Sequence, residues 1–268
     1  MILLPLSLVL ISAFFHSFWN MLVKRSKDKT LFTFLTVWIA VAVYTPFIIV
    51  IQPKLVIPWQ GWACIFGTGT VYCFYFLLLP KSYDLADLSI AYPLARGLAP
   101  ALTVVWAYSF LGERPSLVGW LGIALVISSI YLFHAREMAS DWSGIVEVLR
   151  TSLPAIATGV STSIYSIVDK VGVSFVNPVL YIYLTFLFAS VVLSPVFLTR
   201  YGVSRITSQV KGAWGEILTS GSLCIFAYLV VLFAMQMAEV SYILPLRSTS
   251  ILFAVLLGLE VLGERRTW

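Results

Sequence analysis

Residues 86–96 read ADLSIAYPLAR, and residues 238–247 read AEVSYILPLR, which aligns with the first stretch when one residue is deleted. Beyond the final arginine of each stretch the spacing is constant. Arg96 precedes an LGER run at 111–114 at the same distance as Arg247 precedes the LGER run at 262–265. Both stretches lie in apolar segments, so the chain contains a repeated unit.

A weaker match extends the repeat toward the start of each copy. Residues 16–20 read HSFWN and are followed by Lys24, and residues 162–166 read TSIYS and are followed by Lys170. The first five apolar segments therefore correspond to the sixth and those after it. A unit of five helices is odd, so the second copy enters a membrane in the opposite sense, as in many secondary transporters.

The composition requires a lipid environment. The chain has 268 residues, of which 60% are hydrophobic and 11% charged, and its mean hydropathy is +0.96. Soluble domains carry about 25% charged residues. At about 20 residues per span, nine segments are candidates, at 3–23, 31–51, 61–80, 86–110, 116–134, 152–173, 178–198, 217–237 and 240–261.

These segments predict an all-α integral membrane protein, a polytopic helix bundle. Only helices and closed barrels satisfy every backbone polar group in lipid, and the segments are too long and uniformly apolar for barrel strands of about 10 residues. The connections are short, which leaves no room for a soluble domain. The N-terminal segment lacks the basic start of a cleavable signal and predicts a retained first span.

Basic residues gather on one side of the predicted spans. Three, Lys54, Arg114 and Lys170, fall on one side, and twelve on the other: Lys24, Arg25, Lys27, Lys29, Lys81, Arg136, Arg150, Arg200, Arg205, Lys211, Arg265 and Arg266. The positive-inside rule then places the larger set in the cytoplasm and the N-terminus outside. This clustering at span ends also argues against nucleic-acid binding, despite a net charge of +5.

Other chemistries have no support in the sequence. Cys64, Cys73 and Cys224 lie in apolar segments and form no CxxC pair, so neither disulfides nor a zinc site is expected. There is no P-loop, HExxH or GxSxG motif. We therefore expect no enzyme, no metal and no cofactor.

The chain resembles the EamA-type members of the drug/metabolite transporter superfamily. The resemblance rests on the paired AxxSxxxPL-like segments, the two LGER runs and the HxxWN run at His16, and it covers essentially the whole chain. It implies ten helices in two inverted five-helix repeats around a solute cavity. We expect the first repeat at 1–138, with five helices, and the second at 139–268, with four. The tenth helix is expected to be missing, because only Thr267 and Trp268 follow Arg266.

Arg96 and Arg247 are the strongest candidates for solute binding. Each lies well inside an apolar span, where a charge costs about 2.5–3.5 kcal/mol on insertion scales. One interpretation is an internal contact with a carbonyl group, Asp87 or Glu239. The other is that they line the transport path and bind a carboxylate or phosphate, which guanidinium groups contact at two points.

Further candidates lie near these arginines or at matched positions in the two copies. His16, Trp19 and Asn20 share one helix face at i, i+3 and i+4. One interpretation is a solute-binding face on which His16 shuttles protons, and the other is contact between helices. The remaining candidates are Tyr92, Tyr165 and Tyr242.

Three kinds of residue have a structural alternative. Pro93 and Pro245 predict kinks, either for packing or for a binding break. Asp169 is interpreted as a boundary ion pair with Lys170, the alternative being a proton-coupling carboxylate. Glu113 and Glu264 are expected to stabilise helix N-termini, where the dipole favours a carboxylate.

Together these patterns predict a secondary-active transporter of a small metabolite, anionic or amino-acid-like, working by alternating access, with proton coupling as one driving force. Its partners are the solute and the lipid bilayer, and we expect a multi-pass protein of a bacterial inner membrane. The alternative is a non-transporting membrane subunit or a truncated remnant of such a transporter.

Overall fold

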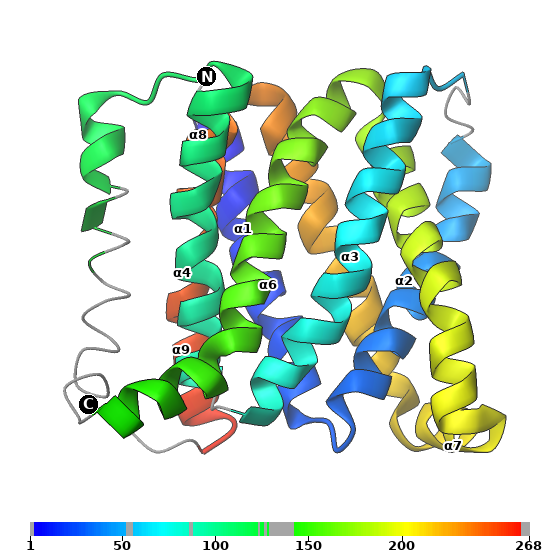
Figure 1. Ribbon diagram of the computed structural model, residues 1–268. Helices are drawn as coiled ribbons and strands as arrows, with labels where there is room; N and C mark the ends of the chain where they lie inside the picture. The colour runs from blue at the N-terminus through cyan, green and yellow to red at the C-terminus, as the bar shows by residue number, and fades with distance from the viewer. Residues whose placement is uncertain are drawn as a thin grey trace.

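The computed structural model describes residues 3–51, 56–85, 88–122, 124–125, 128 and 142–263, and leaves out the side chains of residues 88–96 and 142–151. This part of the chain is all-α and contains no strand. Figure 1 shows its helices side by side in one bundle. They are α1 (Leu3–Arg25), α2 (Lys29–Ile51), α3 (Trp59–Leu85), α4 (Leu88–Trp106), the π-helix η1 (Ala107–Leu111), α6 (Trp142–Phe175), α7 (Pro178–Met237), α8 (Val240–Arg247) and α9 (Ser250–Glu260).

The apolar segments form helices of membrane-spanning length. Within the described ranges, five stretches are long and apolar enough to cross a bilayer: α1, α2, α3, α7 and the α8–α9 pair. This confirms the predicted membrane helix bundle. The span predicted at 116–134 is described only in part, at 116–122, 124–125 and 128, and the described residues resume at Trp142.

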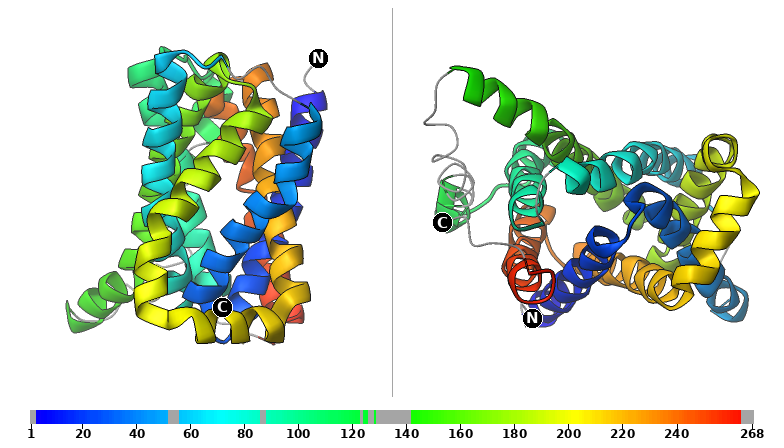
Figure 2. Two further views of the ribbon diagram at one scale, coloured as in Figure 1. Left: turned by 90° about the vertical axis from the view of Figure 1, so that its right-hand side faces the viewer. Right: turned by 90° about the horizontal axis from the view of Figure 1, so that it is seen from below.

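α7 is two spans in one continuous assignment. Its 60 residues contain both the 178–198 and the 217–237 segments, and non-helical backbone angles occur at Gly202 (φ 68°) and Ala213 (φ −138°). A positive φ costs glycine nothing, because it has no Cβ. The chain turns around here, at the bottom of Figure 1 and in the left view of Figure 2. We call the two arms α7a (178–201) and α7b (214–237).

The last predicted span is divided into α8 and α9. Beyond Pro245 the backbone forms i→i−3 bonds, from Ser248 N to Pro245 O (3.0 Å) and from Thr249 N to Leu246 O (3.1 Å). Proline lacks the N–H that would continue the helical ladder, so a break is expected near this point. The matching α4, which contains Pro93, runs uninterrupted to Trp106.

Matched positions of the sequence repeat adopt matched structures. Gly112 and Gly263, the glycines of the two LGER runs, have φ values of 69° and 68°. Lys24 donates to Tyr83 O (2.9 Å) at the end of α3. Lys170 donates to Met235 O (2.5 Å) and Ala238 O (2.9 Å) at the end of α7.

These correspondences support the interpretation that the chain contains two copies of one unit. The contacts of Lys24 and Lys170 are evidence that the sequence alignment does not contain. The boundary predicted between residues 138 and 139 falls outside the described residues and stays a prediction.

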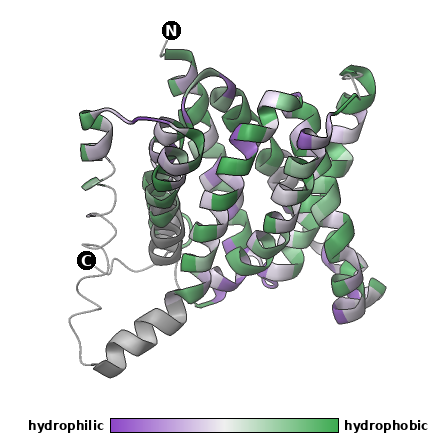
Figure 3. Ribbon diagram, turned by 45° about the horizontal axis from the view of Figure 1, so that its top comes forward, coloured by the Kyte–Doolittle hydropathy of each residue, from purple (hydrophilic) through white to green (hydrophobic). Residues whose placement is uncertain are grey.

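The bundle is apolar outside and tied together by hydroxyl groups inside. Exposed side chains include Val50 (80%) and Leu252 (68%), and hydrophobic colour dominates the helices in Figure 3. Between helices, Ser12 Oγ donates to Ala227 O (2.6 Å) and Ser17 Oγ to Ser250 O (2.7 Å). Small hydroxyl residues let helices approach closely and bond across the interface, as membrane bundles require.

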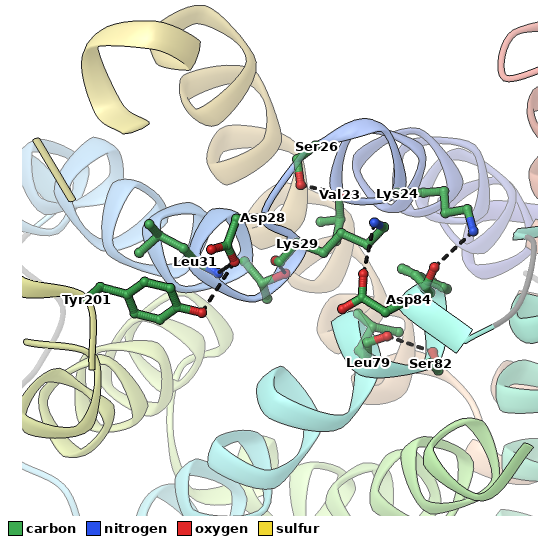
Figure 4. Close-up of polar contacts among 12 residues, drawn as sticks. Val23, Lys24, Ser26, Asp28, Lys29, Leu31, Leu79, Ser82, Asp84 and Tyr201 are labelled. Atoms are coloured by element: carbon green, nitrogen blue, oxygen red, sulfur yellow. Dashed lines mark hydrogen bonds and ion pairs between the residues drawn. The ribbon is translucent and has the colours of Figure 1, made fainter. Parts of the chain in front are cut away.

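Basic residues meet at one end of the bundle, where α1 passes into α2 and where α7 turns. Lys29 pairs with Asp84 (2.9 Å) and Arg205 with Asp28 (2.7 Å). Figure 4 shows this end, with the Lys29–Asp84 pair and the Tyr201–Asp28 contact as dashed lines. We call it the basic end.

Candidate functional site

A small cavity lies at the centre of the bundle. Its walls come from α1, α3, α6, both arms of α7, and α8, and its lining residues are His16, Trp19, Tyr72, Tyr75, Phe76, Tyr165, Phe186, Cys224, Tyr228 and Arg247. Both sequence repeats therefore contribute. The open volume is about 20 Å³, which is room for about one water molecule. The cavity is therefore too small for a metabolite in this conformation.

Arg247 supplies the positive charge of the cavity. Its side chain is 2% exposed. Its Nη2 atom lies 3.1 Å from His16 Nδ1, and its Cζ atom lies 4.8 Å from the centroid of the Tyr228 ring. Within the described part of the chain, Nε and Nη1 have no hydrogen-bond partner. The guanidinium group is thus buried with donor capacity left over.

His16 is fixed by two donors. Trp19 Nε1 donates to His16 Nδ1 across 3.1 Å, one helical turn away, and Arg247 approaches the same nitrogen. Indole and guanidinium N–H groups only donate, so Nδ1 is an acceptor here and carries no proton. The predicted placement of His16 and Trp19 on one face is confirmed, and Tyr165, from the matching helix of the second repeat, completes that wall.

The other predicted site residues lie elsewhere. Asn20 accepts from Tyr83 OH (2.7 Å) and donates to His16 O (2.6 Å), which makes it a contact between α1 and α3. Tyr242 is 42% exposed, and its hydroxyl accepts from Ser116 N (2.9 Å). The side chains of Tyr92 and Arg96 lie outside the described part of the structure.

Asp169 occupies a position that sequence reasoning assigned wrongly. It is fully buried, and its carboxylate accepts from Thr68 Oγ1 (2.6 Å), Tyr181 OH (2.8 Å) and Tyr228 OH. Lys170 donates to backbone carbonyls instead. The predicted boundary ion pair is therefore wrong, because neighbouring residues on a helix face different ways.

Tyr228 connects the two buried charges. Its hydroxyl donates to Asp169 while its ring lies beneath Arg247. A cation over an aromatic ring face is stabilised by about 0.5–2 kcal/mol, with the larger values in desolvated sites. The polar network thus runs from Asp169 on α6 through α7b and α8 to His16 on α1.

Aromatic rings form the rest of the wall. The centroid of the Tyr72 ring lies 4.9 Å from that of Tyr165, 5.5 Å from that of Phe186 and 6.1 Å from that of Tyr228. Tyr75 and Phe76 share the α3 face with Tyr72 at i+3 and i+4, a spacing visible in the sequence that we did not single out. Among the described residues, the cavity lining therefore combines the Arg247 cation with an apolar, polarisable surface.

Glu113 performs the expected helix-end role on another helix. Its carboxylate accepts from Val240 N (3.0 Å) and Ser241 N (2.9 Å), at the N-terminus of α8. The carboxylate satisfies backbone donors that have no partner within the helix. The structural assignment of Glu113 is confirmed, and Glu264 lies outside the described residues.

Comparisons with known proteins identify relatives of this chain. The EamA-like transporter family matches residues 3–134 and 150–268, nearly the whole chain. The uncharacterized protein y4nH of Sinorhizobium fredii (strain NBRC 101917 / NGR234) is 38% identical over 60 residues. That match covers 22% of this chain and 50% of the relative, so the chain spans half of the relative's length.

A solved structure, described only as the crystal structure of a protein, has the same fold. Its TM-score is 0.65 at 21% sequence identity, and the match covers 98% of this chain and 91% of that one.

Proposed function

The chain belongs to the EamA-like transporter family, and from this premise we propose that it is a secondary-active transporter of a small metabolite whose carboxylate or similar anionic group binds Arg247. The chain is a multi-pass membrane protein, and we place it in a bacterial inner membrane. The observation that carries the proposal is the buried Arg247, with two donor nitrogens that have no partner among the described residues.

The chemistry of the cavity favours an anion with an apolar body. A guanidinium group forms charge-assisted N–H···O bonds with carboxylate oxygens, and Nε and Nη1 of Arg247 have no partner among the described residues. The rings of Tyr72, Tyr75 and Phe76 supply an apolar surface beside it. The described lining contains no carboxylate. A carboxylate there would repel an anionic solute.

The arrangement of the two copies supports a mechanism of alternating access. The cavity has about 20 Å³ of open volume, too little for a metabolite, so a solute enters only when helices separate. In inverted-repeat transporters, one copy rocks against the other around a central site. The matched contacts of Lys24 and Lys170, at opposite ends of the bundle, support such a motion.

The proposal is tested by a ligand-stability screen on the purified chain in detergent. A solute that binds the folded state stabilises it by about 2.7 kcal/mol at a concentration of 100 Kd. We expect carboxylates with an apolar or aromatic body to raise the melting temperature. Their uncharged amide analogues should not.

Two variants make this screen specific. Arg247→Gln should abolish the carboxylate-dependent shift, whereas Arg114→Gln, which removes an exposed cation, should retain it. Stabilisation by neutral or cationic solutes alone, or a full carboxylate shift in Arg247→Gln, would contradict the proposal.

A further inference from the structure

Two clefts adjoin at the basic end of the bundle, away from the central cavity. The first, of about 490 Å³, lies between the α1–α2 connection and the stretch of α7 that turns, and Arg25, Lys27 and Arg205 line it. The second, of about 570 Å³, shares Lys27 and Arg205 with it and adds Arg200. Both are far larger than the central cavity and open to the surface.

The two clefts carry an excess of positive charge. Five basic and three acidic side chains line them. Two of the acids, Asp28 and Asp84, are already paired with Arg205 and Lys29, and the third is Glu216. Among the described residues, Arg25 and Lys27 have no carboxylate partner.

Neutral donors accompany these cations. Ser208 and Gln209 line the first cleft, and neither side chain forms a hydrogen bond with another described residue. Ser26 also lines it, but its hydroxyl already donates to Val23 O (2.8 Å). Cations with neutral N–H and O–H donors beside them are the groups that bind phosphate oxygens.

The position of the clefts fits the headgroup layer of a bilayer. The 201–213 stretch joins two membrane spans, and its apolar residues Tyr201, Ile206 and Val210 pack on the core. Val203 (69% exposed) and Trp214 (49% exposed) face outward from the same region. Tryptophan is enriched at the membrane–water interface, and exposed apolar side chains there are suited to acyl chains.

We propose that the first cleft, lined by Arg25, Lys27 and Arg205, binds the phosphate headgroup of an anionic phospholipid. The occupant is a lipid, because the cleft adjoins apolar residues at interfacial depth. The excess charge faces the leaflet that the positive-inside rule assigns to it, where anionic lipids attract basic residues. This site does not depend on the solute bound at Arg247.

The test compares the lipid selectivity of the full-length chain in nanodiscs. Spin-labelled phosphatidylglycerol and phosphatidylcholine are titrated, and the bound fraction of each is measured by electron paramagnetic resonance. We expect wild type to prefer the anionic lipid and the double variant Arg25→Gln/Lys27→Gln to lose about fivefold of that preference for each cation removed. Glu216→Gln should increase the preference.

Lys211→Gln is the matched control, because Lys211 is an exposed cation at the same end that does not line either cleft. Its selectivity should change less than twofold. The proposal is overturned if the double variant keeps the wild-type selectivity or if Lys211→Gln loses as much as one cleft cation. It is also overturned if 10 mM inorganic phosphate displaces the anionic lipid from wild type, since the cleft would then be a free-phosphate site.

Discussion

At the residue scale, the site depends on Tyr228, which touches both buried charges. Its hydroxyl stabilises the Asp169 carboxylate, and its ring stabilises the Arg247 guanidinium group. A buried charge without such partners costs several kcal/mol. Tyr228 therefore holds the charges at fixed positions and leaves Arg247 with free donors.

Tyr228→Phe should destabilise the protein by about 1.5–3 kcal/mol, the range for a hydrogen bond to a charged group. The ring beneath Arg247 is kept, so the loss reports the hydroxyl alone. Thermal unfolding in detergent measures it. Tyr72→Phe is the control, because no described residue bonds the Tyr72 hydroxyl. Equal losses in the two variants would contradict the role assigned to Tyr228.

At the element scale, the second repeat is held to the first by a cap across the repeat boundary. Glu113, beyond the end of η1, accepts from the first N–H groups of α8. α8 is short and ends at Arg247, so its position determines where the guanidinium group lies. The cap is thus part of how the site is built.

Glu113→Ala should lower the stability by about 1–2 kcal/mol, the usual cost of losing an N-terminal cap. The matched control is Glu239→Ala, because Glu239 occupies the N-cap position of α8 without a side-chain capping bond. Thermal unfolding of both variants in detergent provides the comparison. A larger loss in Glu239→Ala would show that the capping carboxylate is misassigned.

The packing of α2 on α7b makes a second prediction at this scale. A Cβ on Gly221 would lie 2.8 Å from Thr36 O and 2.9 Å from Ala40 N, whereas one on Gly215 meets nothing within 4 Å. Gly221→Ala should therefore cost about 1–3 kcal/mol through overpacking. Gly215→Ala should be neutral or stabilising, since alanine favours helix. Denaturation midpoints distinguish the two, and equal midpoints would contradict the close approach.

The sequence predicted what depends on one helix at a time. The spans and the buried Arg247 were visible, because apolar length and an isolated charge are local signals. Contacts between helices were not. The sequence predicts a pair between Asp169 and its neighbour Lys170, although the partners of Asp169 are Thr68, Tyr181 and Tyr228 on other helices. Proline predicts a kink at both Pro93 and Pro245, but the helix breaks only after Pro245, and α4 continues past Pro93.

At the scale of the whole molecule, the two copies enclose the central cavity, and basic residues gather at one end of the bundle. The basic end is tied by the Lys29–Asp84 and Arg205–Asp28 pairs (Figure 4). The motion proposed between the copies would rearrange such end contacts. The proposed lipid cleft lies beside these ion pairs, at the end where the chain turns.

The most direct measurement of transport through this centre is counterflow of the stabilising carboxylate in proteoliposomes preloaded with unlabelled solute. Wild type should accumulate radiolabelled solute transiently. Arg247→Gln should reduce the initial rate at least tenfold, while Lys211→Gln, which removes a cation far from the cavity, should stay within twofold. Wild-type counterflow in Arg247→Gln would contradict a central anion site, and counterflow absent from every protein, wild type included, would contradict transport itself.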